Sequence, residues 1–258
     1  MDSLRRNQYL QAMGVDVWVP RRPIGSPGED LNSGLLAPHA SGPEVVVTTD
    51  VSVDNPLTTV AATYDAPTAT PDWDGLRSQV LACTKCTLHT SRTQGVFGVG
   101  NRQAQWLVVG EAPGAEEDRR GEPFVGRAGH LLDAMLRSIG LNRQSNVYIA
   151  NVLKSRPPGN RDPKPEEVAA CLPYLLRQIQ LLRPRVMLAV GRIAAQNLLA
   201  TDAPLGRLRG KVHHFGELNT PLIVTYHPAY LLRTPSDKRK AWEDLKFALS
   251  VFRGLNST

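Results

Sequence analysis

Short apolar runs alternate with amphipathic segments along the chain from residue 73 onward. Four runs rich in Val, Ile, Leu and Ala have the length of buried strands, at residues 105–110, 147–151, 186–190 and 222–226. Helical periodicity occupies residues 128–140, 164–182, 192–200 and 236–252. Strands that alternate with helices favour right-handed crossovers and a parallel sheet with both faces covered. The pattern therefore predicts an α/β fold of three layers, α/β/α, with a central four-stranded parallel sheet.

The first 72 residues have a different character. Residues 3–13 have the spacing of one short amphipathic helix, and from Gly25 to Pro71 the chain is rich in Pro, Gly, Ser, Thr and Ala with no sustained period. A segment of this composition cannot bury enough apolar area to offset the entropy lost on ordering. We therefore expect residues 1–72 to be a short helix plus a largely disordered linker, and residues 73–258 to be the folded domain.

The charge of the chain follows the same division. The 258 residues carry a net charge of +6. Residues 1–72 contain 4 Lys/Arg and 9 Asp/Glu, a net charge of −5, whereas residues 73–258 contain 26 and 15, a net charge of +11. A basic domain of this kind favours a polyanionic partner such as nucleic acid. A solvated basic surface is the alternative.

The three cysteines, Cys83, Cys86 and Cys171, argue against a disulfide framework because their number is odd and the chain is long. Cys83-x-x-Cys86 instead has the spacing of a metal-ligand pair, and Cys171 supplies a third thiolate. His89 could complete a Cys3His zinc site, and three unligated thiols are the other alternative. No apolar run reaches transmembrane length and no signal peptide is recognisable, so we expect a cytoplasmic location.

Candidate chemistry lies where the predicted strands end, because ligands of open parallel sheets bind beyond the carboxyl ends of the strands. The first strand runs into a Gly-rich segment that contains Phe124, a stacking platform or a core residue. The second strand ends at Asn151, whose amide can read the edge of a base or cap a turn. The fourth strand leads to His227, a candidate catalytic imidazole or a turn residue. This combination suits a planar heterocycle carried on a phosphate backbone.

Five motifs resemble, in order, those of the family 4 (iron–sulfur type) uracil-DNA glycosylases. They are CTKCTLH, GEAPGAEEDRRGEPFVGRAGHLL, NVLKSRPPGNRDP, AAC and HPAYLLR, and the match covers residues 75–252. The resemblance implies a uracil-DNA glycosylase-like three-layer fold, which agrees with the strand pattern. It also implies hydrolysis of the N-glycosidic bond of uracil in DNA, the first step of base-excision repair. Such an enzyme flips the target nucleotide out of the stack into a pocket.

The resemblance assigns base recognition to the strand ends. It implies that Phe124 stacks on the uracil ring and that Asn151 pairs with uracil N3–H and O4. Cytosine presents the reversed donor and acceptor pattern, so an amide held in one orientation would disfavour it. His227 would stabilise negative charge on uracil O2 as the bond breaks.

Two carboxylates complete the catalytic set implied by the resemblance. Glu117 matches a position that walls off the C5 side of uracil and so rejects the thymine methyl group. Glu111 and the backbone at Ala112 line the pocket. The sequence leaves open which group activates water, since a water held between the pocket wall and a DNA phosphate would also serve.

Cations in the same loops are the predicted DNA contacts. Arg156 and Arg161 follow Asn151, and Arg233 closes the HPAYLLR motif. Phosphate contacts by these side chains would make binding sensitive to salt. The sequence does not distinguish single-stranded from double-stranded DNA.

The cofactor is where this chain departs from the family. The resemblance implies a [4Fe–4S] cluster on four cysteines, of which Cys83, Cys86 and Cys171 match, while Ser155 replaces the fourth. Three outcomes follow. Ser155 ligates iron through oxygen, the cluster is labile or reduced to a three-iron form, or the metal is absent.

Three readings of function therefore remain. The first is a uracil-DNA glycosylase, and the second is a glycosylase for other deaminated bases. The third is a catalytically inactive DNA-binding or cluster-sensing module. Uracil-containing DNA is the expected partner and a monomer the expected state. The N-terminal arm, with its segment DVWVP, is a candidate tether to a repair or replication protein.

Overall fold

The computed structural model describes residues 71–255, so the predicted helix at 3–13, the linker and the DVWVP segment lie outside the described residues. The first described helix begins at Trp73, the residue at which the sequence predicts the folded domain to begin. In chain order the elements are α2 (Trp73–Leu81), η1 (Thr87–Thr90), β1 (Val99–Gly100), β2 (Trp106–Gly110), α3 (Ala115–Arg120), α4 (Arg127–Ser138), β3 (Val147–Asn151), η2 (Pro158–Asn160), α5 (Pro165–Leu182), β4 (Val186–Val190), α6 (Arg192–Leu199), α7 (Leu205–Leu208), β5 (His213–Phe215), β6 (Thr220–Thr225), α8 (Pro228–Arg233), η3 (Pro235–Asp237) and α9 (Lys238–Gly254).

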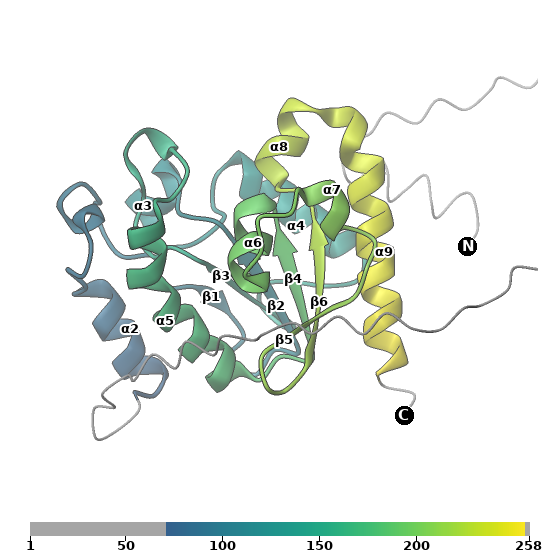
Figure 1. The fold of residues 1–258 in the computed structure, drawn as a ribbon, viewed down its shortest axis with the longest axis horizontal. Helices are drawn as coiled ribbons and strands as arrows, with labels where there is room; N and C mark the ends of the chain where they lie inside the picture. The colour runs from purple at the N-terminus through teal and green to yellow at the C-terminus, as the bar shows by residue number, and fades with distance from the viewer. Residues whose placement is uncertain (1–70, 256–258) are drawn as a thin grey trace, which may run out of the picture. The chain divides into compact units, whose positions relative to one another are not determined.

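The strands form one sheet in the order β1-β3-β2-β4-β6-β5 (Figure 1). Its four central strands run parallel, as predicted, with β2 paired to both β3 and β4, and β4 paired to β6. The two edge strands, β1 and β5, are antiparallel to their neighbours and were not predicted. They are two and three residues long, too short to show a periodic pattern.

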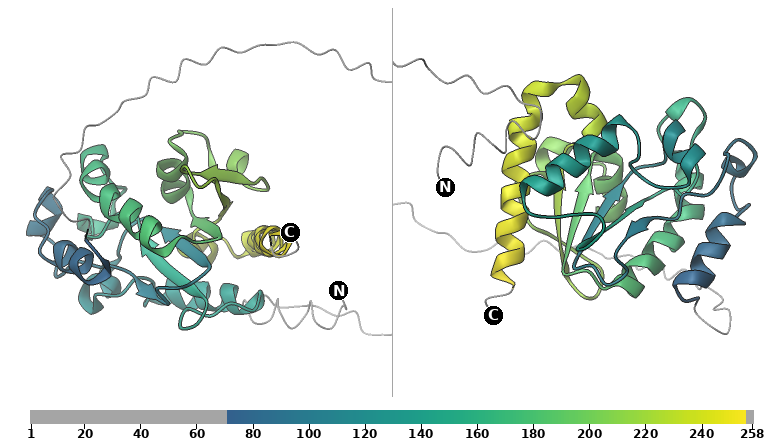
Figure 2. Two further views of the ribbon diagram at one scale, coloured as in Figure 1. Left: turned by 90° about the horizontal axis from the view of Figure 1, so that it is seen from below. Right: turned by 180° about the vertical axis from the view of Figure 1, so that it is seen from behind.

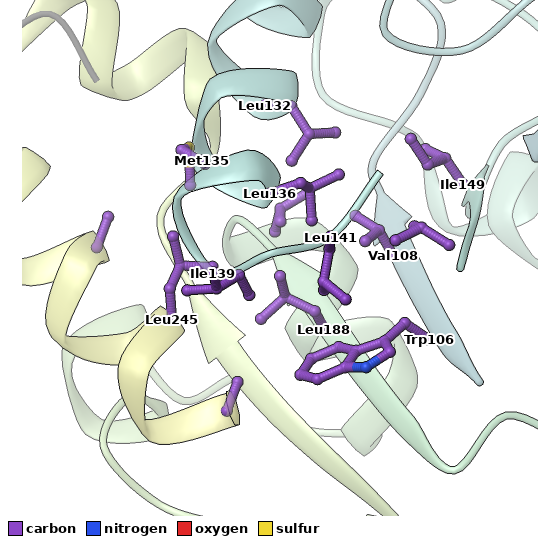
Figure 3. Close-up of a cluster of buried hydrophobic side chains, with 14 of the residues drawn as sticks. Trp106, Val108, Leu132, Met135, Leu136, Ile139, Leu141, Ile149, Leu188 and Leu245 are labelled. Carbon is purple, nitrogen blue, oxygen red and sulfur yellow. The ribbon is translucent and has the colours of Figure 1, made fainter. Parts of the chain in front are cut away.

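Alternate residues of the central strands face two separate cores, which explains why the strands read as continuous apolar runs. On one face, Val108, Ile149 and Leu188 pack against α4 and α9 (Figure 3). On the other face, Val109, Ala189 and their neighbours pack against α5 and α6. Helices α5 and α6 lie in front of the sheet in Figure 1, and α4 lies in front of it in the right panel of Figure 2, which is the view from behind. These helices therefore cover opposite faces of the sheet. The predicted three-layer α/β/α class is therefore confirmed.

The ends of helix α4 and helix α5 follow from local sequence. Gly140 ends α4 with φ of +80°, and the N–H of Leu141 donates to Leu136 O at 2.9 Å, a Schellman closure. Helix α5 begins with Pro165, and Glu167 turns back to accept from Lys164 N–H at 2.9 Å. Among residues 71–255, none of the helices combines the length and the apolar character needed to cross a lipid bilayer.

Candidate active site

A cavity of about 390 Å³ opens where β2 and β3 end and α8 begins. Eight residues singled out from the sequence line it: Glu111, Ala112, Glu117, Phe124, Asn151, Arg161, His227 and Arg233. The predicted DNA contact Arg156 and the predicted cluster positions are not among the lining residues. The parallel topology brings distant motifs together here, because β2, β3 and β6 deliver their carboxyl ends to one edge of the sheet.

The amide of Asn151 is positioned for an external partner. The residue is the last of β3 and is 2% exposed, and its Oδ1 is buried without a hydrogen-bond partner in the described part of the chain. A buried hydrogen-bond acceptor without a donor destabilises the protein, and a bound ligand that supplies the donor removes this cost. Gly110, at the end of β2, makes room for it: a Cβ there would overlap Asn151 Oδ1 and would lie 2.6 Å from the Phe124 ring.

The Phe124 ring is held in place by its own backbone. Phe124 has φ of +56°, a left-handed conformation that a bulky residue seldom adopts without support. Arg143 supplies that support, donating to Phe124 O at 2.8 Å and to Pro123 O at 3.3 Å, while Asp133 accepts from Arg143 Nε at 2.7 Å. Gly129 of α4 completes the fit, because a Cβ at that position would overlap the Phe124 carbonyl.

His227 presents a defined tautomer to the cavity. It is the N-cap of α8, and its Nδ1 accepts from the backbone N–H of Ala229 at 3.1 Å. A backbone N–H can only donate, so Nδ1 carries the lone pair and the proton of the neutral ring sits on Nε2. Burial, together with a smaller effect of the charge of Arg233, lowers the pKa of His227 to about 4, against an opposing effect of Glu117. Near pH 7 the ring is therefore a neutral Nε2–H donor.

Glu111 is the carboxyl group of the cavity whose protonation changes near neutral pH. Burial raises its pKa to about 7, with a second contribution from the carboxylate of Asp162. Arg192 opposes the rise, and it pairs with Asp162 at 2.7 Å on the rim of the cavity. A carboxyl group with this pKa can take up a proton during a reaction at neutral pH.

Glu117 has a different environment. One oxygen accepts from Val125 N–H at 2.9 Å and Gly126 N–H at 3.0 Å, and the other accepts from Gly114 N–H at 3.1 Å. Its carboxylate therefore joins the start of α3 to the loop that carries Phe124. Three backbone donors occupy it, so its bonding is that of a group that fixes the shape of the cavity.

The three predicted cationic DNA contacts are not equivalent. Arg161 forms a bidentate pair with Glu167, which is 1% exposed, at 2.5 and 2.9 Å. Arg156 does not line the cavity and donates to Oδ1 of Asn160, a lining residue, at 2.8 Å. Arg233 is exposed at the cavity rim and has no ion-pair partner within residues 71–255. Arg233 is therefore the most available of the three for a phosphate.

Ser155, in the loop that follows β3, makes a buried polar contact. Its Oγ accepts from Arg92 Nη1 at 2.8 Å, and the residue is 3% exposed. Nη2 of the same guanidinium donates to the carbonyls of Leu81 at 2.8 Å and Cys83 at 3.0 Å. Arg92 thus ties the loop of Ser155 to the segment that enters the Cys-x-x-Cys motif.

The three cysteines occupy one neighbourhood. Cys171 is buried on α5, and burial raises the pKa of its thiol, with smaller contributions from the charges of Cys86 and Cys83. Within residues 71–255, no three His, Cys, Asp or Glu side chains converge where a single metal ion would bind. His89 is exposed, with its ring nitrogen at 2.7 Å from Cys86 O. Within the described residues, His89 and the three thiols, the alternative zinc ligands named from the sequence, do not converge on one point.

These contacts bear on the predicted iron–sulfur cluster. Three thiols match three corners of a cluster, but the fourth position carries a neutral hydroxyl already bound to a guanidinium. Serine oxygen ligates iron as an alkoxide, whereas the Ser155 hydroxyl is directed here to the guanidinium of Arg92. The donor set fits three thiolate corners and does not fit a four-thiolate [4Fe–4S] site.

Comparison with known proteins agrees with this geometry. The model of the uracil DNA glycosylase superfamily matches residues 97–246. The chain belongs to the uracil-DNA glycosylase superfamily. Its relatives include type-4 uracil-DNA glycosylases of Archaeoglobus fulgidus (47% identical; 67% of this chain and 89% of that protein), Thermotoga maritima (44%; 68% and 92%) and Pyrobaculum aerophilum (43%; 67% and 91%). The family resemblance noted in the sequence is thereby confirmed.

Some lining residues of this superfamily site were not singled out from the sequence. Asp162 and Tyr230 stand inside the quoted motifs, and the rule that strand-end loops carry function could have included them. The Arg143–Asp133 pair behind Phe124 had no sequence signal. Its role depends on how α4 and the following loop pack, which no local pattern encodes.

Proposed function

We propose that this protein is a uracil-DNA glycosylase, which hydrolyses the N-glycosidic bond of uracil flipped out of DNA and so begins base-excision repair. One observation carries the proposal: the buried, unpartnered Oδ1 of Asn151 lies in the same cavity as the Phe124 ring and the His227 imidazole. Those two rings are 5.6 Å apart between centroids, with planes 33° apart. An aromatic face, an amide edge and an imidazole donor together suit a pyrimidine.

Asn151 reads the base. Its Oδ1 accepts from uracil N3–H, which satisfies the orphan acceptor, while its amide N–H donates to O4. Cytosine offers a lone pair at N3 and an amino group at C4, so both contacts would become repulsive. An amide held in this orientation would therefore discriminate between the two bases.

His227 stabilises the departing base. As the bond between C1′ and N1 breaks, the electron pair stays on uracil and the sugar becomes oxocarbenium-like. The Nε2–H of the neutral imidazole donates to uracil O2, where negative charge grows. A donor preorganised at such a position is worth on the order of 3 kcal/mol of barrier.

Glu111 receives the proton of the attacking water. The water oxygen bonds to C1′, one water proton passes to the Glu111 carboxylate, and uracil leaves as the anion. Half-ionised at pH 7, Glu111 is matched to this task. Glu117 does not act as a base in this scheme, since it holds the loop of Phe124 through three backbone N–H groups.

A second part of the proposal concerns the cofactor and follows from which side chains are present as metal ligands. Cys83, Cys86 and Cys171 would hold an iron–sulfur cluster through three thiolates, in a three-iron or labile form, with Ser155 remaining on Arg92. The cluster would supply a cross-link between the Cys-x-x-Cys loop and α5. Anaerobically purified protein should then contain iron and sulfide, and Ser155→Cys should slow the loss of iron to a chelator. The cofactor proposal would be contradicted if anaerobically purified protein contained no iron and if treatment with a chelator left its thermal stability unchanged.

A panel of oligonucleotides tests the proposed activity. Strands with a single uracil, hypoxanthine, xanthine or cytosine are incubated with the full chain and then cleaved with alkali at abasic sites. We expect scission at uracil and none at cytosine. Preferred scission at hypoxanthine or xanthine would transfer the activity to other deaminated bases. No scission on any strand, with DNA binding retained, would indicate a binding module.

A further inference from the structure

Lys154 is a buried amine that the proposed mechanism does not use. The residue is 1% exposed and is among the largest side chains that the fold buries completely. Moving an amine from water into the protein interior is unfavourable unless hydrogen bonds compensate for the lost hydration. Its Nζ donates to two acceptors, Asn151 O at 2.8 Å and Gln178 Oε1 at 2.6 Å. One of these acceptors belongs to the residue that is proposed to read the base.

The pair of Lys154 and Gln178 lies where the pairing of β1 with β3 ends. Continued by two residues, the register of these strands would set Phe97 opposite Asn151. Side chains bind the two carbonyl groups instead, because Lys154 Nζ donates to Asn151 O and Gln178 Nε2 donates to Phe97 O at 2.9 Å. Gln178, on α5, is completely buried. The two side chains therefore form a bridge that replaces main-chain pairing at the end of β3.

The peptide group that follows the Asn151 side chain is held on both sides. Its C=O accepts from Lys154 Nζ, and its N–H, which belongs to Val152, donates to Gly110 O at 3.0 Å. Gly110 is also the residue whose missing Cβ makes room for the Asn151 amide. Without the Lys154 amine, one of these two hydrogen bonds would remain, and the peptide plane could tilt about it. The Asn151 side chain leaves the adjoining Cα atom, so a tilt would move Oδ1 within the cavity.

We propose that Lys154 is a positioning residue, which holds Asn151 in the orientation that reads uracil and so sets the discrimination against cytosine. The inference rests on the proposed function. Lys154 is not among the residues that line the cavity, so it acts through the backbone of Asn151. Orientation decides which base an amide accepts, because exchanging the places of its oxygen and nitrogen would match the hydrogen-bonding edge of cytosine.

The thiol of Cys171 offers a competing explanation for the buried amine. The backbone N–H of Lys154 donates to Cys171 Sγ at 3.5 Å, and Cys171 is one of the thiols proposed to hold iron. A positive charge beside that thiolate would favour ligation. The hydrogen bonds of Nζ, however, go to Asn151 O and Gln178 Oε1. The two explanations differ in what a substitution of Lys154 changes, which is base discrimination in one case and iron content in the other.

Two variants of the full chain remove the amine. Lys154→Met keeps an unbranched apolar side chain in its place. Lys154→Met combined with Gln178→Met serves if the single variant unfolds, because replacing both hydrogen-bond partners by apolar groups of similar shape can be nearly neutral for stability. Tyr148→Phe is the matched control. It removes a hydroxyl that accepts from Gln178 Nε2 at 3.4 Å, in the same buried network but one residue removed from the bond to Asn151.

The first measurement is binding to short single strands that carry either 2′-fluoro-deoxyuridine or 2′-fluoro-deoxycytidine, whose electron-withdrawing fluorine slows bond cleavage. We expect the preference for the uracil strand, taken as the ratio of the two dissociation constants, to fall about tenfold in the Lys154 variants. Tyr148→Phe should keep the wild-type ratio. An unchanged ratio in the Lys154 variants, with or without loss of iron, or an equal fall in Tyr148→Phe, would overturn the proposal.

The second measurement needs no substrate. In protein labelled with ¹⁵N at asparagine, the side-chain amide of Asn151 should give one sharp pair of proton signals in the wild type and in Tyr148→Phe. In the Lys154 variants the pair should shift and broaden, because the amide is no longer held in one orientation. Unchanged Asn151 signals in these variants would overturn the inference whatever the activity. Equal binding of both strands by the wild type, with the signals changed as expected, would instead count against the proposed function.

Discussion

The protonation of Glu111 makes the proposed mechanism testable by pH. Burial and the nearby Asp162 raise the pKa of this carboxyl group from 4.5 to about 7. The carboxylate is the form that accepts the water proton, so excision should speed up as pH rises through this range. His227, with a pKa of about 4, stays neutral above pH 5 and adds no second change there.

The magnitude follows from the fraction of Glu111 that is ionised. That fraction is about one half at pH 7, about one tenth at pH 6 and about one hundredth at pH 5. Single-turnover rates should therefore fall about fivefold from pH 7 to 6 and about tenfold over the next unit. Glu111→Gln should lower the rate at pH 8 by about a hundredfold or more and remove this dependence.

The assay is single-turnover excision from a uracil-containing strand between pH 5 and 9, with enzyme above its dissociation constant. Two rim variants serve as matched controls. Asp162→Asn removes a charge that raises the Glu111 pKa, so the rise of the excision rate with pH should move to lower pH. Arg192→Gln removes a charge that lowers this pKa, so the rise should move to higher pH. The role of Glu111 would be refuted if the wild-type rate were constant from pH 6 to 8, or if the rise of the rate with pH persisted in Glu111→Gln.

Stability gives an independent check on the same group. The folded-state pKa of Glu111 lies above its ordinary value, so the folded protein holds this proton more tightly than the unfolded chain does. The contribution of Glu111 to stability should therefore decline as pH rises from about 4.5 to 7. Buried His227, with its lowered pKa, contributes in the opposite sense between about pH 4 and 6.5, so the effect of Glu111 is read from the difference between wild type and Glu111→Gln. Thermal melts should show Glu111→Gln more stable than wild type at pH 8, with the difference vanishing near pH 4.5.

Three further substitutions probe the other parts of the cavity. His227→Ala should reduce single-turnover excision by about a hundredfold or more while the dissociation constant for uracil-free DNA changes little, and near-normal excision would remove His227 from the mechanism. Asn151→Asp should lose the preference for uracil over cytosine or lose activity altogether, measured on paired oligonucleotides; unchanged discrimination would argue against base-edge recognition. Arg143→Gln should release the backbone of Phe124 and weaken binding of uracil-containing relative to uracil-free strands, whereas an equal change on both would assign Arg143 to stability alone.

The extent to which the sequence predicted this site differs between residues. The strands at 147–151 and 186–190 were predicted at the bounds that the structure has, because residues buried on both faces leave an uninterrupted apolar run. Asn151 and His227 were found because a parallel sheet collects its strand ends at one edge. The edge strands β1 and β5 were missed because so few residues carry no readable period.

The sequence by itself determined the layers, the central strands and the residue types that meet at the strand ends. These properties follow from local periodicity and from the order of motifs along the chain. Tertiary structure alone decided the chemical state of the residues. Contact with Ala229 N–H fixed the His227 tautomer, and burial together with Asp162 raised the Glu111 pKa. Glu167 engaged the guanidinium of Arg161 in an ion pair. The same is true of Ser155, whose hydroxyl meets Arg92, 63 residues away along the chain. Protonation, pairing and desolvation depend on which groups are neighbours in space, and no local pattern specifies those neighbours.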